Sequence, residues 1–123
     1  MRTLADAGPL VAFLNKRDKH FSWAAAEFVR LPAPLLTCEA VLTEACFRIA
    51  RQGGSAAAPL SLLERGAISL GFSLSEERDA VARIMNRYAS LGASLADACL
   101  VRMSELHPRS QIFTIDRDFL VYR

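Results

Sequence analysis

The chain has 123 residues, of which 52% are hydrophobic and 23% are charged, and its net charge at neutral pH is +2. This length suits one domain spanning residues 1–123, and the apolar content argues against a disordered chain. The small net charge is compatible with a nucleic-acid partner, but it argues against a strongly basic phosphate-binding domain.

The cysteines and the N-terminal segment bear on the cellular compartment. Cys38, Cys46 and Cys99 are odd in number and form no CxxC pair, which argues against a disulfide framework and a zinc site and predicts free thiols. Asp6 interrupts the apolar start that would otherwise resemble a signal peptide, and no run reaches the ~18 apolar residues of a membrane span. We therefore expect a cytoplasmic protein with no membrane association.

Short apolar runs alternate with longer segments of helical periodicity along the whole chain. In chain order we predict a strand over 2–5, helices over 9–14 and 21–31, a strand over 35–38, helices over 39–51 and 57–65, a strand over 68–72, helices over 76–88 and 94–105, and a strand over 111–115. Strands separated by helices predict an α/β fold with a central parallel sheet and helices on both faces.

A few residues mark where these helices begin and end. Pro9 suits a first helical position, and Pro32 ends the second helix. Gly53 and Gly54 end the helix over 39–51. Ser75 is followed by two glutamates, which predicts that its hydroxyl caps the helix over 76–88.

Two acidic residues directly follow predicted strands. Asp6 comes after the first strand and Asp116 after the last. The carboxyl ends of parallel strands line the crevice in which α/β proteins bind ligands. These two carboxylates are therefore candidates for one site.

Two further acids are placed among apolar neighbours on helices. Glu44 lies three residues from Val41 and three from Phe47, and Asp97 lies inside the run LADACLV. Each acid alone is equally well explained as a helix cap or a surface ion pair. All four together would need a neutralising partner, because an unpaired buried charge costs several kcal/mol. Mg²⁺ or Mn²⁺ suits a site made only of oxygen ligands.

Four motifs carry a resemblance to a known family. In order they are DAGPLVAFL, TCEAVLTEA, SLADACLV and TIDRDF, and they extend over essentially the whole chain. This ordered set resembles the PIN-domain nucleases, particularly toxins of the VapC type. The resemblance implies a three-layer α/β/α domain, endoribonuclease activity that depends on Mg²⁺ or Mn²⁺, and often a homodimer.

The resemblance also assigns roles to the acidic residues. Asp6, Glu44, Asp97 and Asp116 match the family's four acidic positions, with Asp6 and Asp97 as the main direct metal ligands and the other two acting partly through water. Thr114 matches a polar position that commonly precedes the last acid. Asp118 is an alternative to Asp116, which we favour because it follows the strand directly. Family members usually continue into one more strand after the last one predicted here, so the prediction does not fix which strand forms that edge of the sheet.

The leading functional prediction is the toxin of a VapBC-type pair, which hydrolyses RNA phosphodiesters with a metal-activated water and is held inactive by a cognate antitoxin. The alternatives are a housekeeping RNA-processing nuclease and a non-catalytic PIN-like module that binds RNA or protein. A receiver-like or phosphatase-like domain ranks below these, because no DxD motif follows the first strand and no lysine follows Lys19.

Several other side chains are candidates for contacts with RNA or antitoxin. Trp23 lies on the amphipathic helix over 21–31, a region that contributes to partner binding in VapC-type proteins. Arg48, Arg51 and Arg102 are candidate contacts to substrate or antitoxin.

Overall fold

A central sheet of four parallel strands organises the computed structural model, which describes residues 1–122. The strands are β1 (Arg2–Ala5), β2 (Leu35–Thr37), β3 (Ile68–Leu70) and β4 (Ser110–Phe113). Their order is β3-β2-β1-β4, and every adjacent pair is parallel. The predicted parallel sheet is confirmed.

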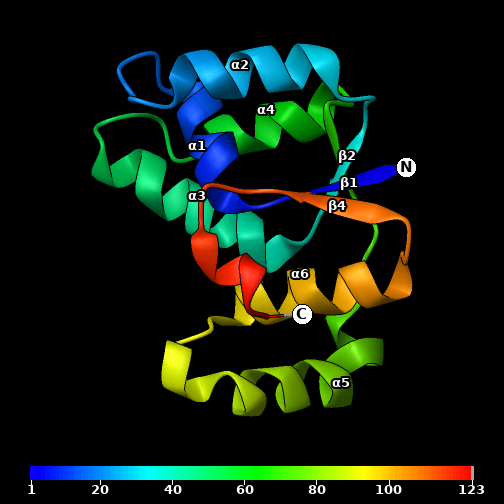
Figure 1. The fold of residues 1–123 in the computed structure, drawn as a ribbon. Coiled ribbons are helices and arrows are strands. Elements are labelled where there is room, and N and C mark those ends of the chain that lie inside the picture. The colour runs from blue at the N-terminus through cyan, green and yellow to red at the C-terminus, as the bar shows by residue number, and fades with distance from the viewer. Residues whose placement is uncertain (123) are drawn as a thin grey trace.

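Helices cover both faces of this sheet (Figure 1). They are α1 (Ala7–Leu14), α2 (Phe21–Arg30), α3 (Glu39–Arg51), α4 (Ala58–Glu64), α5 (Leu74–Arg87) and α6 (Leu95–Leu106), with 3₁₀ turns η1 (Ala89–Leu91) and η2 (Arg117–Leu120). In Figure 1, α1, α2 and α4 lie above the sheet, α5 and α6 lie below it, and α3 contacts both α1 and α6. The predicted three-layer α/β/α architecture is confirmed.

The central strand β1 is buried from Thr3 to Ala5 because both of its faces are covered. In β1, Leu4 pairs with Leu36 on one side and with Ile112 on the other, and Leu4 itself is fully buried. Strands buried on both faces read as continuous apolar runs rather than as alternating patterns. The core therefore lies against β1, and the outer strands β3 and β4 form the edges.

The strands end earlier than the sequence pattern predicted. The third strand stops at Leu70 and the fourth at Phe113, where the Asp6 N–H donates to the Phe113 carbonyl at 3.1 Å. Beyond Phe113 the chain leaves the sheet, because its partner strand β1 ends at Ala5, opposite Phe113, and the next residue, Asp6, caps α1. Apolar periodicity along one strand does not report where the partner strand ends.

Two helix starts also differ from the prediction. The first helix begins at Ala7, before Pro9, because the Asp6 carboxylate accepts from the Ala7 N–H at 2.8 Å and caps the helix itself. The cap of α5 is Ser73 and not Ser75: the Ser73 hydroxyl accepts from the Glu76 N–H at 3.3 Å. Ser73 stands three residues before Glu76, which is the capping-box spacing, whereas Ser75 stands three residues before Arg78, so the sequence itself favours Ser73.

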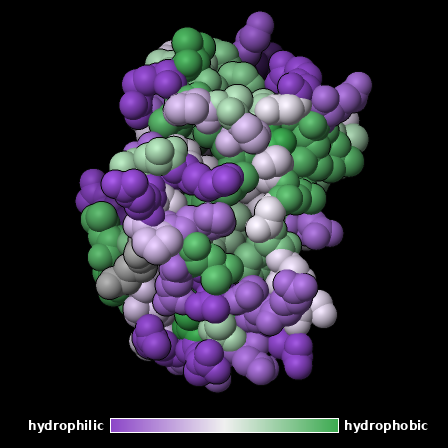
Figure 2. Space-filling view, turned by 90° about the vertical axis from the view of Figure 1, so that its right-hand side faces the viewer, coloured by the Kyte–Doolittle hydropathy of each residue, from purple (hydrophilic) through white to green (hydrophobic). Residues whose placement is uncertain are grey.

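The cysteines are free, as predicted, and the surface is of mixed hydropathy. Among the described residues all three cysteines are free, with Cys38 and Cys99 buried and Cys46 half-buried. Figure 2 views the side at which β1 begins and shows hydrophilic and hydrophobic residues interspersed over it. Within residues 1–122, no helix combines the length and apolar character needed to cross a membrane.

Candidate active site

The carboxyl ends of β1 and β4 place Asp6 beside Thr114. These strands are neighbours, with Ala5 opposite Phe113, so the residues that follow each strand meet at the same edge. The Thr114 hydroxyl donates to Asp6 Oδ2 at 2.7 Å, while Asp6 Oδ1 accepts from Ala7. Asp6 is only 7% exposed, so it presents a largely buried carboxylate at this edge.

Asp116 joins the same network through Thr114. Its backbone N–H donates to the Thr114 hydroxyl at 2.9 Å, so one threonine contacts both the first and the last acid. The Asp116 side chain in turn accepts from the Asp118 N–H at 2.8 Å and caps η2. Asp116 is exposed, while Asp118 supplies only a backbone donor to this network.

Asp97 is held at the start of α6 by a reciprocal cap. The Asp97 N–H donates to the Ser94 hydroxyl at 3.0 Å, and the Ser94 N–H donates to Asp97 Oδ2 at 3.1 Å. This capping box fixes the carboxylate at the helix N-terminus, where the helix dipole favours negative charge. The phenol of Tyr122 also donates to Asp97 Oδ2, at 3.2 Å.

Glu44 lies at the margin of the buried face of α3. That face runs through Val41, Ala45 and Ile49, at helical spacing, and Glu44 is half-buried beside it. Phe47, three residues further along α3, is 61% exposed, so of the two apolar neighbours of Glu44 only Val41 faces the core. The buried face therefore adjoins Glu44 on the side of Val41 and leaves Phe47 outside it.

The four acids influence one another electrostatically. Burial raises the pKa of Asp6, and the negative charges of Asp97 and Asp116 raise it further, against the hydrogen bonds from Thr114 and Ala7. Burial likewise raises the pKa of Glu44, with added contributions from Asp6 and Asp97. Two strand ends and two helices therefore bring these carboxyl groups into one neighbourhood.

Within the described residues no ion pair neutralises these acids, and only Arg48 places a positive charge near one of them, Glu44. Across residues 1–122 the ion pairs use the carboxylates of Glu27, Glu77, Asp79 and Glu105, and none uses the four acids of the site. Oxygen-only donors with excess negative charge fit a hard divalent cation by their chemistry. Mg²⁺ in particular is held by one or two carboxylates while it keeps several waters.

The acids do not form a closed cage of ligands. In the described part of the chain, no group of three or more His, Cys, Asp or Glu side chains is arranged to hold a metal ion. Asp6 and Asp97 instead direct oxygens to hydrogen-bond donors of their own segments. Metal ligation by all four acids therefore stays a prediction.

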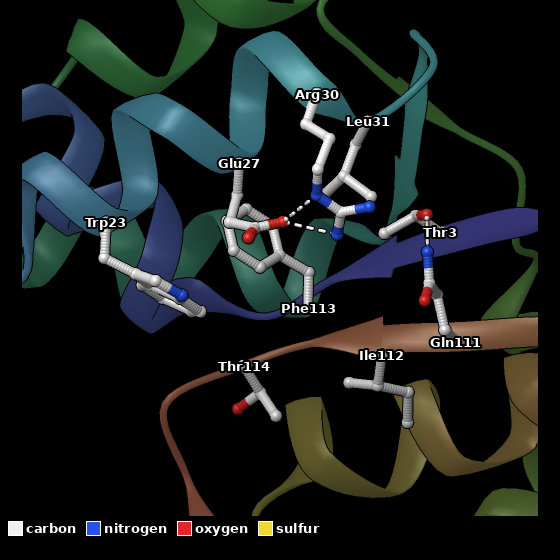
Figure 3. A pocket seen from close by; sticks show the side chains of 9 residues that line it. All are labelled: Thr3, Trp23, Glu27, Arg30, Leu31, Gln111, Ile112, Phe113 and Thr114. Atoms are coloured by element: carbon white, nitrogen blue, oxygen red, sulfur yellow. Dashed lines mark hydrogen bonds and ion pairs between the residues drawn. The ribbon is translucent and has the colours of Figure 1, made fainter.

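A cleft of about 220 Å³ between α2 and β4 adjoins the acidic network at Thr114 (Figure 3). Trp23 lies over Phe113 with ring centroids 5.1 Å apart, and it is 41% exposed. Arg30 pairs with Glu27 at 2.6 Å, three residues earlier on α2, so this ion pair lies on the α2 wall of the cleft. The cleft thus combines one half-exposed aromatic ring with a neutralised ion pair.

The structure assigns a different role to one predicted basic contact. The Arg102 guanidinium binds Glu77 at 2.6 Å and Glu105 at 3.1 Å, so it links α6 to α5. Arg51 lies over the Phe47 ring at 5.6 Å on the exposed side of α3. Arg48 borders a surface cavity together with Glu44, which leaves it as a candidate contact near the acids.

Sequence reasoning missed three residues that support the site. Ser94 could have been found, because serine three residues before an acid is a capping-box pattern. Thr37 is fully buried and donates to the Ala5 carbonyl at 2.8 Å, directly before Asp6. Nothing local in the sequence marks Thr37 or Tyr122, since each contacts a residue at least 25 positions away.

Comparison with known proteins identifies the family and the fold of this chain. The sequence profile of the PIN domain matches residues 3–123. The crystal structure of VapC20 from Mycobacterium tuberculosis, described as a toxin that cleaves the sarcin–ricin loop, is similar with a TM-score of 0.86 and 17% identity. The match covers 97% of this chain and 93% of VapC20. No curated protein sequence matches the chain.

Proposed function

This chain belongs to the PIN domain family, and on that premise we propose that it is a metal-dependent endoribonuclease and the toxin of a VapBC-type toxin–antitoxin pair. The observation that carries the proposal is the gathering of Asp6, Glu44, Asp97 and Asp116, none of which forms an ion pair within the described chain, while only Glu44 has the positive charge of Arg48 nearby. Such uncompensated charge is costly in a purely structural role, whereas a cation-binding nuclease requires it.

We assign the acids different tasks. Asp6 and Asp97 would hold Mg²⁺ or Mn²⁺ directly, with Glu44 and Asp116 completing the acidic edge. Each of the first two keeps a fixed orientation, because Thr114 holds Asp6 and the Ser94 cap holds Asp97. We favour Asp116 over Asp118 as the fourth acid, since the Asp116 backbone shares Thr114 with Asp6.

The reaction class follows from this donor set. Asp6 and Asp97 would hold a divalent cation here, which would provide a nucleophile from water and offset the charge that develops on the phosphodiester. The protein contributes orientation: buried and partly buried hydrogen bonds fix the carboxylates before substrate arrives. No side chain is needed as a covalent nucleophile, so a single hydrolytic displacement is expected.

The partners belong to the same proposal. RNA is the substrate, a cognate antitoxin inhibits the enzyme, and two copies form a homodimer in the cytoplasm. Exposed apolar side chains support protein partners: Val29 on α2, Phe47 on α3 and Leu120 in η2 are each more than half exposed. Light scattering of the purified protein measures whether it is a dimer.

Cleavage of RNA by purified wild-type protein and by Asp6→Asn tests the proposal. The substrates are total RNA and an oligonucleotide with the sarcin–ricin loop sequence, each with Mn²⁺ or with EDTA. We expect cleavage by the wild type with Mn²⁺ only, and none by Asp6→Asn. Asparagine retains the cap on α1, so the variant stays folded. Cleavage by folded Asp6→Asn would refute the mechanism, while RNA binding without cleavage would favour a non-catalytic module.

A further inference from the structure

The segment after the last acid returns to the site and contacts a second acid. It begins at Asp116, whose carboxylate accepts from Asp118, and the Tyr122 N–H donates to the Asp118 carbonyl at 3.2 Å. The Tyr122 side chain then reaches Asp97, 25 positions earlier in the chain. One short turn thus connects the acid after β4 with the acid at the start of α6.

The phenol of Tyr122 is held rigidly in place. Tyr122 is 2% exposed, and its ring packs on Tyr88 and Phe119 with centroid distances of 5.1 and 5.2 Å. A buried aromatic ring in such a cluster has little rotational freedom. Its hydroxyl therefore presents a donor to Asp97 at a fixed position.

The two oxygens of Asp97 have different environments. Oδ2 accepts two hydrogen bonds, from the Ser94 N–H at 3.1 Å and from the Tyr122 hydroxyl at 3.2 Å. Oδ1 accepts none within residues 1–122. Two donors on one oxygen fix the plane of the carboxylate, and the other oxygen is left for a ligand.

We propose that Tyr122 is a positioning residue for the metal ligand Asp97: together with Ser94 it occupies Oδ2 and presents Oδ1 to the divalent cation. This inference rests on the metal-dependent function proposed above and adds a residue outside the acidic quartet. Residues that orient metal ligands through hydrogen bonds typically change metal affinity 10- to 100-fold when they are removed. The turn from Asp116 to Tyr122 then couples the positions of two acids.

The chain provides a matched control in the same aromatic cluster. Tyr122→Phe removes only the hydroxyl and keeps the ring packing against Tyr88 and Phe119. Tyr88→Phe removes a hydroxyl from the neighbouring ring, which forms no hydrogen bond within the described residues, and leaves Asp97 untouched. Asp97→Asn serves as the reference for loss of the ligand charge, because asparagine can still take part in the cap.

The experiment is a titration of each folded protein with Mn²⁺ alone, in which electron paramagnetic resonance measures the free ion and circular dichroism verifies folding. We expect Tyr122→Phe to bind Mn²⁺ about 10- to 100-fold more weakly than the wild type, and Tyr88→Phe to match the wild type. The Mn²⁺ concentration for half-maximal RNA cleavage should rise by the same factor, with the rate recovered at saturating Mn²⁺.

Two results would overturn the inference, and they are distinguishable. Equal Mn²⁺ affinity in Tyr122→Phe and the wild type, with Asp97→Asn impaired, would remove Tyr122 from the metal site and leave the proposed function intact. Mn²⁺ binding that is absent from the wild type, or unaffected by Asp97→Asn, would refute the proposed metal site itself and the role of Tyr122 with it.

Discussion

Thr114 offers a quantitative test of how the site is held together, because it contacts both Asp6 and Asp116. In Thr114→Val the methyl groups keep the shape of the side chain, but the 2.7 Å bond to Asp6 Oδ2 and the 2.9 Å bond from Asp116 are lost. A hydrogen bond to a charged group contributes about 1.5–3 kcal/mol. Thr114 is half-buried, so we expect the lower end, about 1.5 kcal/mol at neutral pH.

This loss converts into a measurable melting temperature. An unfolding entropy of about 2.1 cal mol⁻¹ K⁻¹ per residue over 123 residues gives about 0.26 kcal mol⁻¹ K⁻¹. A loss of about 1.5 kcal/mol therefore lowers the unfolding temperature of the metal-free protein by about 6 °C. Thr114→Ser keeps the hydroxyl and should stay close to the wild type, which makes it the control.

The effect of Thr114→Val should depend on pH. The Thr114 hydroxyl donates to ionised Asp6 and thereby lowers a pKa that burial raises. Its contribution is present when Asp6 is ionised and is lost as pH falls through the folded-state pKa. Thermal unfolding without metal, at about pH 7.5 and at about pH 3.5, below the ordinary aspartate pKa of about 3.9, measures this. Equal melting temperatures for the valine and serine variants at pH 7.5, or a deficit that persists undiminished at pH 3.5, would refute the reasoning.

The remaining predictions concern the pH profile, one ion pair and one turn. Because the folded-state pKa values of Asp6 and Glu44 are raised, metal-free stability should fall as pH rises from about 4 through those values. Asp6→Asn should flatten this fall, and an unchanged profile in denaturant titrations would contradict the role of Asp6. Arg102→Gln should lower the free energy of unfolding by about 1 kcal/mol or less, since the ion pair with Glu77 is partly exposed. RNA cleavage should stay at the wild-type rate, and reduced cleavage would show that Arg102 contacts the substrate. Gly53→Ala should cost about 1 kcal/mol in urea unfolding because Gly53 has φ of 86°; unchanged stability would show that the turn relaxes.

Local patterns predicted much of the fold because they report burial along one segment at a time. The bounds of α3 agree with the prediction, since its apolar spacing is flanked by β2 and by Gly53. Positions after strand ends also predicted Asp6 and Asp116 as candidates, because parallel strands deliver their carboxyl ends to one edge. Such rules need no knowledge of which strands are neighbours.

Sequence patterns gave a wrong prediction, or none, where a feature depends on a distant segment of the chain. The last strand was predicted to reach Ile115, but it ends at Phe113, because its distant partner β1 ends at Ala5. Phe47 is apolar and lies three positions from Glu44, yet it is exposed, because α3 buries another side against α1 and α6. Periodicity identifies an apolar side chain without identifying the surface that covers it.

The sequence by itself determined the alternation of strands and helices, the acids that follow the strands, and the resemblance to a PIN domain. Each of these can be recognised in short stretches of consecutive residues. Only the tertiary structure decided the strand order β3-β2-β1-β4, the bond from Thr114 to Asp6 and the return of Tyr122 to Asp97. These features depend on chain segments that meet only after the sheet has formed. Hydrogen bonds between distant segments depend on distance and direction in space, and local periodicity contains neither.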